Sequence, residues 1–101
     1  MDSSLDKDPR IIDVLNGLRV SLGADAFRIT DHWDSDLTAV GISSPQNEHV
    51  LVYIAVYDDG YHAELELPPL TDDEGPYQDA GRHSGLTFDQ LVSVVRDHLS
   101  T

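Results

Sequence analysis

The segment formed by residues 31–36, Asp-His-Trp-Asp-Ser-Asp, holds the densest group of potential metal ligands and proton acceptors in the chain. A carboxylate beside an imidazole suits a hard or borderline cation, and it equally suits general-base catalysis. A calcium loop, however, needs a glycine at its sharp turn and a bidentate glutamate, and residues 34–38 supply neither. We therefore interpret the segment as a hairpin turn with solvated acids, and we predict no metal and no cofactor.

A second candidate group is the row His62, Glu64 and Glu66, whose period of two places the three side chains on one face of a β-strand. His62 and Glu64 together could form half of a zinc or acid–base site, but two ligands are too few for a complete one. The other histidines show no His-Glu-x-x-His spacing. Because antiparallel sheets commonly expose one polar face, we interpret the row as a solvent-facing surface.

Two tyrosines, Tyr53 and Tyr57, lie on the strand-like run that precedes this row. Tyrosine is large, rigid and amphipathic, and protein interfaces use aromatic anchors within a polar rim. We therefore predict a partner-binding surface on this face of the sheet. It consists of Tyr53, Tyr57, His62, Glu64 and Glu66.

Sequence motifs for catalysis are absent. The chain contains no Gly-x-Ser-x-Gly elbow and no glycine-rich phosphate cradle. It also contains no cysteine, which excludes disulfides, thiolate metal sites and cysteine nucleophiles. We therefore predict no catalytic residue and a function other than catalysis.

The formal net charge is −13, from 19 acidic residues against six basic ones, and the acids are spread along the chain. Such a surface repels nucleic acid, so we predict no nucleic-acid ligand. It would instead steer a basic protein toward itself, at a rate that falls as salt rises. The same charge is also explained by solubility alone.

The element that must position the candidate surface is a β-hairpin around Asp59-Gly60, a residue pair that tight primed turns prefer. We predict that Asp58 lies opposite Tyr61, which separates an apolar face from a polar one. The predicted apolar pairs are Val56/Ala63, Ile54/Leu65 and Val52/Leu67. The predicted polar-face pairs are Tyr57/His62, Ala55/Glu64 and Tyr53/Glu66.

Helix signals flank the strands. Asp8 as a cap, followed by Pro9, predicts a helix that runs to about Leu22. Thr87 and Gln90 match a capping box and predict the start of a second helix. Its apolar stripe, like that of the first helix, is expected to cover the apolar face of the sheet.

The remaining strands are expected before the hairpin. Period-two alternation predicts a strand from Phe27 to Trp33 and a return strand from Leu37 to Ile42, with Asp31 as a polar exception on the inner side. The stretch from Leu70 to Gly85 is polar, and we predict that it forms a long connection. The prediction is one α+β domain over residues 1–101, with the order α-β-β-β-β-α, a four-stranded antiparallel meander and two helices packed on one face.

Location is predicted from apolar runs. The longest, Val50 to Tyr57, is too short to cross a bilayer, so we expect no membrane association. The first residues, Met-Asp-Ser-Ser-Leu-Asp, lack the basic start and apolar centre of a secretory signal. We therefore expect a cytoplasmic protein.

The segment Asp31 to Ile42, the following Val-Leu-Val-Tyr-Ile strand and the Asp-Asp-Gly-Tyr hairpin together resemble small bacterial immunity proteins of polymorphic toxin systems. The resemblance covers about the middle third of the chain. It implies a cytoplasmic antitoxin that blocks a cognate toxin by direct contact. No functional residue is carried over from the family to a position of this chain.

Three functions follow from these observations. The first is an acidic immunity or inhibitor protein, monomeric or homodimeric, that binds a basic protein partner. An alternative is an acidic secretion chaperone, which predicts homodimers. Another alternative is a small hydrolase or metal-dependent enzyme that uses His62 and Glu64 with the cluster Asp31–Asp36.

Overall fold

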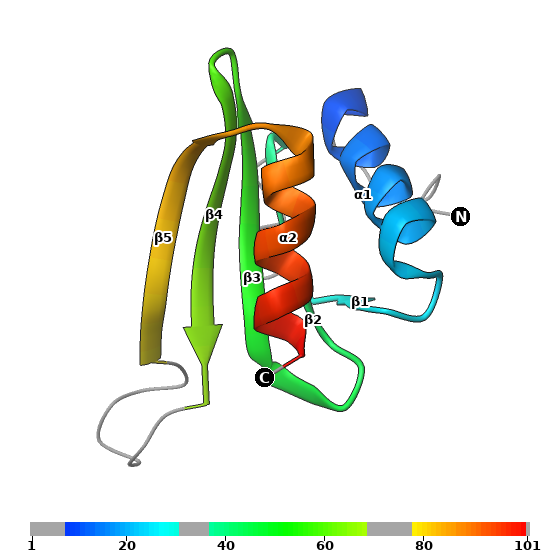
Figure 1. Cartoon of the computed structure of the whole chain (residues 1–101), viewed down its shortest axis with the longest axis vertical. Helices are drawn as coiled ribbons and strands as arrows, with labels where there is room; N and C mark the ends of the chain where they lie inside the picture. Colours follow the sequence, from blue (N-terminus) through cyan, green and yellow to red (C-terminus); the bar gives the residue numbers. More distant parts are fainter. Residues whose placement is uncertain (1–7, 31–36, 69–77, 101) are drawn as a thin grey trace.

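The computed structural model describes residues 8–30, 37–68 and 78–100. Within these residues, two helices enclose five strands along the chain (Figure 1). The elements are α1 (Pro9–Leu22), β1 (Arg28–Ile29), β2 (Ala39–Ser44), β3 (Asn47–Tyr57), β4 (Gly60–Leu67), β5 (Gln78–Leu86) and α2 (Phe88–Leu99). None of the helices in these ranges is long and apolar enough to cross a membrane.

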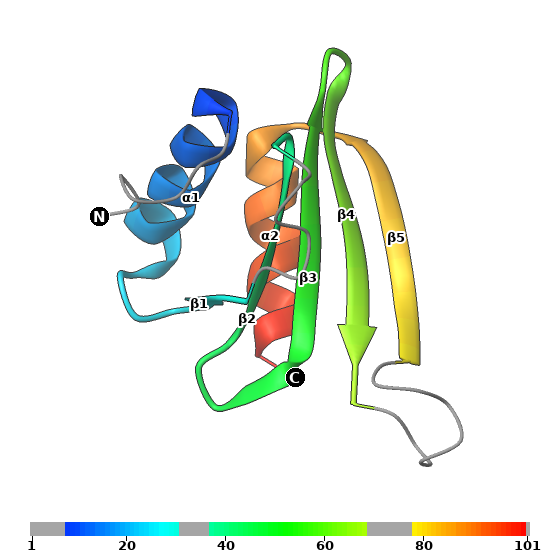
Figure 2. The same cartoon turned by 180° about the vertical axis from the view of Figure 1, so that it is seen from behind.

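The strands form one antiparallel sheet in the order β1-β2-β3-β4-β5, so each strand pairs with its neighbour in sequence. Both helices cover the same face of the sheet, as the two opposite views show (Figures 1 and 2). We call this the inner face and the opposite one the outer face. The α+β class and the antiparallel meander are confirmed, but the predicted number of four strands is wrong because the described residues contain five.

The hydrophobic core lies between the helices and the inner face. Its buried side chains on α1 and α2 confirm the predicted apolar stripes. Each fully buried aliphatic side chain contributes about 1.5–3 kcal/mol relative to an exposed one, which holds both helices on the sheet. The core includes Ile11, Val14, Leu15, Leu18, Leu91 and Val95 from the helices and Val40, Ile42, Val52, Ile54, Val56 and Ala63 from the sheet.

Helix α1 begins and ends at the predicted residues. The Asp8 carboxylate accepts a hydrogen bond from the backbone N–H of Arg10 at 2.9 Å, and Pro9 occupies the first turn. A further hydrogen bond from the Arg10 side chain lowers the pKa of Asp8, which keeps the capping carboxylate charged. At the other end, Gly23 has φ 112° and its N–H donates to the carbonyl of Arg19 at 2.8 Å.

Gly17 in the middle of α1 allows the two helices to approach each other. Glycine at such a position weakens a helix by about 1 kcal/mol relative to alanine. A Cβ atom on Gly17 would lie 2.7 Å from Cζ of the Phe88 ring. The weak helix residue is therefore explained by the packing of α2 against α1.

Helix α2 starts with the predicted capping box. The Gln90 backbone N–H donates to Oγ1 of Thr87 at 3.2 Å, and the Thr87 backbone N–H donates to Oε1 of Gln90 at 2.9 Å. At the far end, His98 is buried and its Nε2 lies 2.8 Å from the backbone carbonyl of Glu66. The capping box fixes the first turn of α2, and the His98 contact fixes its last turn against Glu66 of β4.

Thr87→Ala is expected to lower the free energy of unfolding by about 1 kcal/mol, because the first turn of α2 loses the acceptor of one backbone N–H. Urea denaturation followed by circular dichroism measures the change. Ser21→Ala is the matched control, because Ser21 is an exposed hydroxyl residue near the end of α1. Equal midpoints for the Thr87 variant and the parent would contradict the role of the cap.

The β3–β4 hairpin exists, but its register differs from the prediction. Asp58 and Asp59 form the turn and Tyr57 pairs with Gly60, whereas Asp59-Gly60 was predicted as the loop. No described residue other than glycine has a positive φ, and Gly60 has φ 137°, so the glycine follows the turn. The observed pairs are Val56/Tyr61, Ala55/His62, Ile54/Ala63, Tyr53/Glu64, Val52/Leu65 and Leu51/Glu66.

This difference in register has no effect on the faces of the hairpin. The predicted partner of Ile54 is Leu65 and its observed partner is Ala63, two residues away. Because side chains of a strand alternate with a period of two, a shift of two leaves each one on its original face. The separation into an apolar inner face and a polar outer face is therefore retained.

Strand β5 corrects the prediction for Leu70 to Gly85. Its residues 78–86 pair with β4 instead of forming a connection, with two irregularities of register, between Tyr61 and Ala63 and between Leu65 and Glu66. Gly81 and Gly85 have φ 127° and 64°, which marks local departures from regular strand backbone. Residues 69–77 lie outside the described residues.

The first predicted strand is shorter than expected within the described residues. β1 contains Arg28 and Ile29, which pair with Ser43 and Ile42 of β2. The return strand begins at Ala39, two residues later than predicted, and continues to Ser44. The cluster Asp31–Asp36, including His32 and Trp33, lies outside the described residues.

Candidate functional site

The structure places all five predicted binding residues on the outer face, on β3 and β4. They are Tyr53, Tyr57, His62, Glu64 and Glu66. Tyr57 is 54 % exposed, and the other four are partly buried. Since alternate residues of paired strands share a face, the sheet itself brings these side chains together.

His62 is the centre of this group. Its Nδ1 lies 2.9 Å from Oγ of Ser84 on β5, a hydrogen bond across the β4–β5 pair. The ring of Tyr57 meets the imidazole edge-on, with ring centroids 6.0 Å apart and planes at 61°. The His62 side chain is only 16 % exposed, so contacts on two sides fix its ring.

Glu64 joins His62 to a basic residue. One carboxylate oxygen, Oε1, lies 3.6 Å from Nε2 of His62 and 3.6 Å from Nε of Arg82. These separations are longer than hydrogen bonds, and Arg82 is 68 % exposed, so the ion pair adds little stability. Its effect is to place a guanidinium beside the carboxylate on an otherwise acidic surface.

Sequence reasoning missed Arg82 and Ser84 because it assigned their segment to a connection. The available signal was their spacing, since Arg82 and Ser84 are two residues apart and therefore share a strand face. The glycines Gly81 and Gly85 obscured it. We use the name outer-face patch for the set of Arg82, Ser84 and the five predicted residues. The patch consists of Tyr53, Tyr57, His62, Glu64, Glu66, Arg82 and Ser84.

The chain Ser84–His62–Glu64 contains the residue types of a nucleophile, a base and an orienting acid. In such a site both links are hydrogen bonds of about 2.6–3.2 Å. The hydroxyl of Ser84 meets this distance to His62 Nδ1, but the 3.6 Å between Glu64 and Nε2 exceeds it. The Ser84–His62 link therefore has the length of a hydrogen bond, and the His62–Glu64 link does not.

Metal binding has no support from the described residues. In the ranges 8–30, 37–68 and 78–100, no three histidine, aspartate or glutamate side chains form a group that could hold a metal ion. The alternative that combines His62 and Glu64 with Asp31–Asp36 depends on residues outside these ranges.

The tip of the hairpin extends the patch with negative charge. Asp58 and Asp59 follow Tyr57 directly and are exposed at the end of the longest hairpin in Figure 1. Nη1 of Arg10 lies 3.9 Å from Oδ1 of Asp58, whose side chain is fully exposed. Tyr57 is therefore followed at the tip by two exposed acidic residues, of which Asp58 lies near Arg10 of α1.

The side chains of the outer face are exposed on one side of the sheet and buried on the other. Leu51 and Ala55 of β3 and Ala39 and Ser43 of β2 are buried, although they point away from the helices. On β5, by contrast, Arg82 and Ser84 are exposed. The accessible part of the face therefore lies along β4 and β5 and at the hairpin tip.

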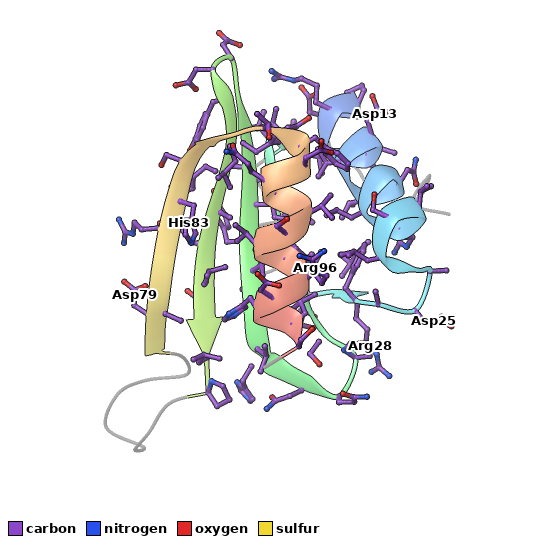
Figure 3. All side chains as sticks on the ribbon, in the orientation of Figure 1. Asp13, Asp25, Arg28, Asp79, His83 and Arg96 are labelled. Carbon is purple, nitrogen blue, oxygen red and sulfur yellow. The ribbon has the colours of Figure 1, made fainter. Side chains whose placement is uncertain are left out.

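Strand β5 is an edge of the sheet, and its polar side chains discourage pairing with another sheet. Figure 3 shows Asp79 and His83 extending from this strand, and both are exposed. Charged edge residues and bulges are the features with which proteins protect such edges. The edge at β5 is therefore poorly suited to pairing with a strand of another molecule.

Comparison of the chain with protein-family models, with curated proteins and with solved structures found no match. The resemblance of its middle third to immunity proteins therefore stays a prediction. Fold, surface chemistry and charge are the observations on which a function can be based.

Proposed function

We propose that the protein is an inhibitor of the immunity type, which blocks a basic protein partner by direct contact through the outer-face patch. The observation that carries the proposal is Tyr57. This residue is a large aromatic side chain that is 54 % exposed, held edge-on against a fixed His62 and followed by two exposed acids.

The patch has the composition of an interface. Binding energy concentrates in a few aromatic or arginine side chains surrounded by groups that exclude water. Tyr57 supplies the aromatic anchor, and His62 and Glu64 lie around it as polar groups. Because the hairpin pairs these residues in one register, little conformational entropy is lost when a partner binds.

The charge of the chain favours a basic partner. A net charge of −13 produces a potential that attracts a positively charged protein toward the molecule. The exposed acids Asp58 and Asp59 add negative charge at the tip of the hairpin that carries Tyr57. The association rate with the partner is therefore expected to fall steeply as the salt concentration rises, because salt screens exposed charges.

The double variant Tyr53→Ala, Tyr57→Ala is expected to weaken partner binding by about 2 kcal/mol or more, which corresponds to roughly thirtyfold. The partner is first captured from the native host with the parent protein and is then purified. Titration calorimetry gives its dissociation constant with parent and variant. Single Tyr57→Ala is measured alongside, because this ring is the more exposed of the two.

Val20→Ala is the matched control, since Val20 is 88 % exposed on α1, on the other side of the molecule from the outer face. Its affinity should equal that of the parent. Circular dichroism confirms that each variant is folded. Partner binding by the folded double tyrosine variant with parental affinity would rule out the outer-face patch.

A further inference from the structure

A polar cavity of about 350 Å³ lies at the turn between β2 and β3, and Asn47 in its lining begins β3, whose other end is at the hairpin tip. Ligand sites usually measure about 300–1,000 Å³, so the cavity can hold a small organic molecule. Its walls come from β1, from the end of β2 and from the turn between β2 and β3. The polar residues that line it are Arg28, Thr30, Ser43, Ser44, Gln46 and Asn47.

The register of β1 and β2 assembles this cavity. Arg28 pairs with Ser43, so both side chains lie on the outer face. The hydroxyl groups of Thr30 and Ser43 are 2.7 Å apart, which fixes the residue after β1 against β2. Two segments that are separated in sequence, 28–30 and 43–47, therefore present hydroxyl, amide and guanidinium groups to one space.

Arg28 gives the cavity a positive charge. No acidic residue lines it among the residues that the structure describes. Arg10, Arg82 and Arg96 each lie near a carboxylate, whereas Arg28 has no ion pair within the described ranges. In a chain with 19 acidic residues, this exposed guanidinium is available to an external anion.

The hydrogen bonds around the cavity leave mainly donors available. Oγ of Ser44 accepts the backbone N–H of Gln46 at 3.3 Å, and Oδ1 of Asn47 accepts the backbone N–H of His49 at 3.0 Å. The Ser44 hydroxyl proton and the Asn47 side-chain N–H groups remain for another acceptor. Ser44 is only 6 % exposed, so a ligand oxygen in the cavity would be a favourable partner for its hydroxyl.

We propose that this cavity binds a small organic oxyanion, either a carboxylate or a phosphate monoester. Arg28 is the charge partner, and Ser44 and Asn47 donate hydrogen bonds. Guanidinium groups bind both kinds of oxyanion through paired, charge-assisted hydrogen bonds. Pro45 supplies an apolar part of the lining for the organic portion of the ligand.

This site is independent of the proposed inhibitor function. Strand β3 runs from Asn47 at the cavity to Tyr57, the aromatic anchor of the outer-face patch, whereas Glu66 of the patch lies nearer, two strands from Ser43. At about 3.3 Å per residue, the two ends are roughly 30 Å apart. Changes at one end can therefore be tested without altering the other.

Titration of the ¹⁵N-labelled full chain tests the proposal. Benzoate and phenyl phosphate are the organic probes, and acetate and inorganic phosphate are their small counterparts, all at constant ionic strength. We expect saturable shifts of the side-chain amide signals of Gln46 and Asn47 and of the Nε–H signal of Arg28. The organic probe with the lower dissociation constant identifies the kind of oxyanion that the cavity prefers.

Arg28→Gln is expected to weaken the affinity for the probe about tenfold or more, because the charge partner is lost. Arg28→Lys should retain part of the affinity, since it keeps the charge without the paired donors. Arg96→Gln is the control, because Arg96 is an exposed arginine of α2 outside this cavity (Figure 3). The proposal is overturned if no probe gives saturable shifts or if Arg28→Gln binds like the parent.

Discussion

Gly60→Ala is expected to lower the free energy of unfolding by about 2–4 kcal/mol, because two separate penalties add at this residue. Gly60 has φ 137°, a conformation that side chains with a Cβ rarely adopt. A Cβ there would also lie 2.9 Å from the carbonyl oxygen of Leu86 and 3.2 Å from the carbonyl carbon of Gly85. Both are backbone atoms of β5, which cannot move aside as a flexible side chain could.

Gly81→Ala separates the two penalties. Gly81 has a similar φ of 127°, but a Cβ there would meet no atom within 4 Å. This variant should therefore show the backbone strain alone, about 1–2 kcal/mol. Urea denaturation measures both variants, and equal losses would mean that the contact between the turn and β5 has no energetic role.

The hairpin at Gly60 also explains how far sequence reasoning could go at the site. Turn residues between two alternating runs identified the hairpin and the faces of its strands. The turn was misplaced by one residue, because Asp58-Asp59 and Asp59-Gly60 give the same alternation of faces. The five predicted surface residues therefore share a face, although their predicted partners across the strands are wrong.

The helices could be predicted because their signals are local. Asp8, Thr87 and Gln90 mark the helix starts through contacts within three residues. Strand β5 has no comparable signal. Its alternation is interrupted by Gly81 and Gly85, and its pairing with β4 is a long-range contact that sequence spacing alone does not reveal.

The two candidate sites differ in predictability for the same reason. Tyr57 and His62 are neighbours across one tight hairpin, so the sequence indicates that they lie close together. Arg28 lies near Ser43 and the residues that follow it only because β1 and β2 pair in one particular register. Period-two alternation predicts a strand at these residues but not its register against β2, so the cavity becomes visible only in three dimensions.

Ile54→Ala is expected to lower the free energy of unfolding by about 2–5 kcal/mol. Ile54 is fully buried, and it lies at the centre of the sheet, paired with Val40 on one side and Ala63 on the other. Truncation removes buried methyl groups and leaves a cavity under the helices, which regular strands on both sides cannot close.

Ile54→Val is the graded control for this variant, with an expected loss of about 0.5–1.5 kcal/mol. Tyr57→Ala, on the same strand but exposed on the outer face, should change stability by less than about 0.5 kcal/mol. Urea denaturation of the three variants therefore separates the two faces of β3.

Partner binding needs only the folded fraction of each variant. Ile54→Ala should therefore keep its affinity for the partner wherever it remains folded, whereas Tyr57→Ala should lose affinity and keep stability. A stability loss in Tyr57→Ala as large as that in Ile54→Ala would mean that the ring is part of the core and not of a binding surface.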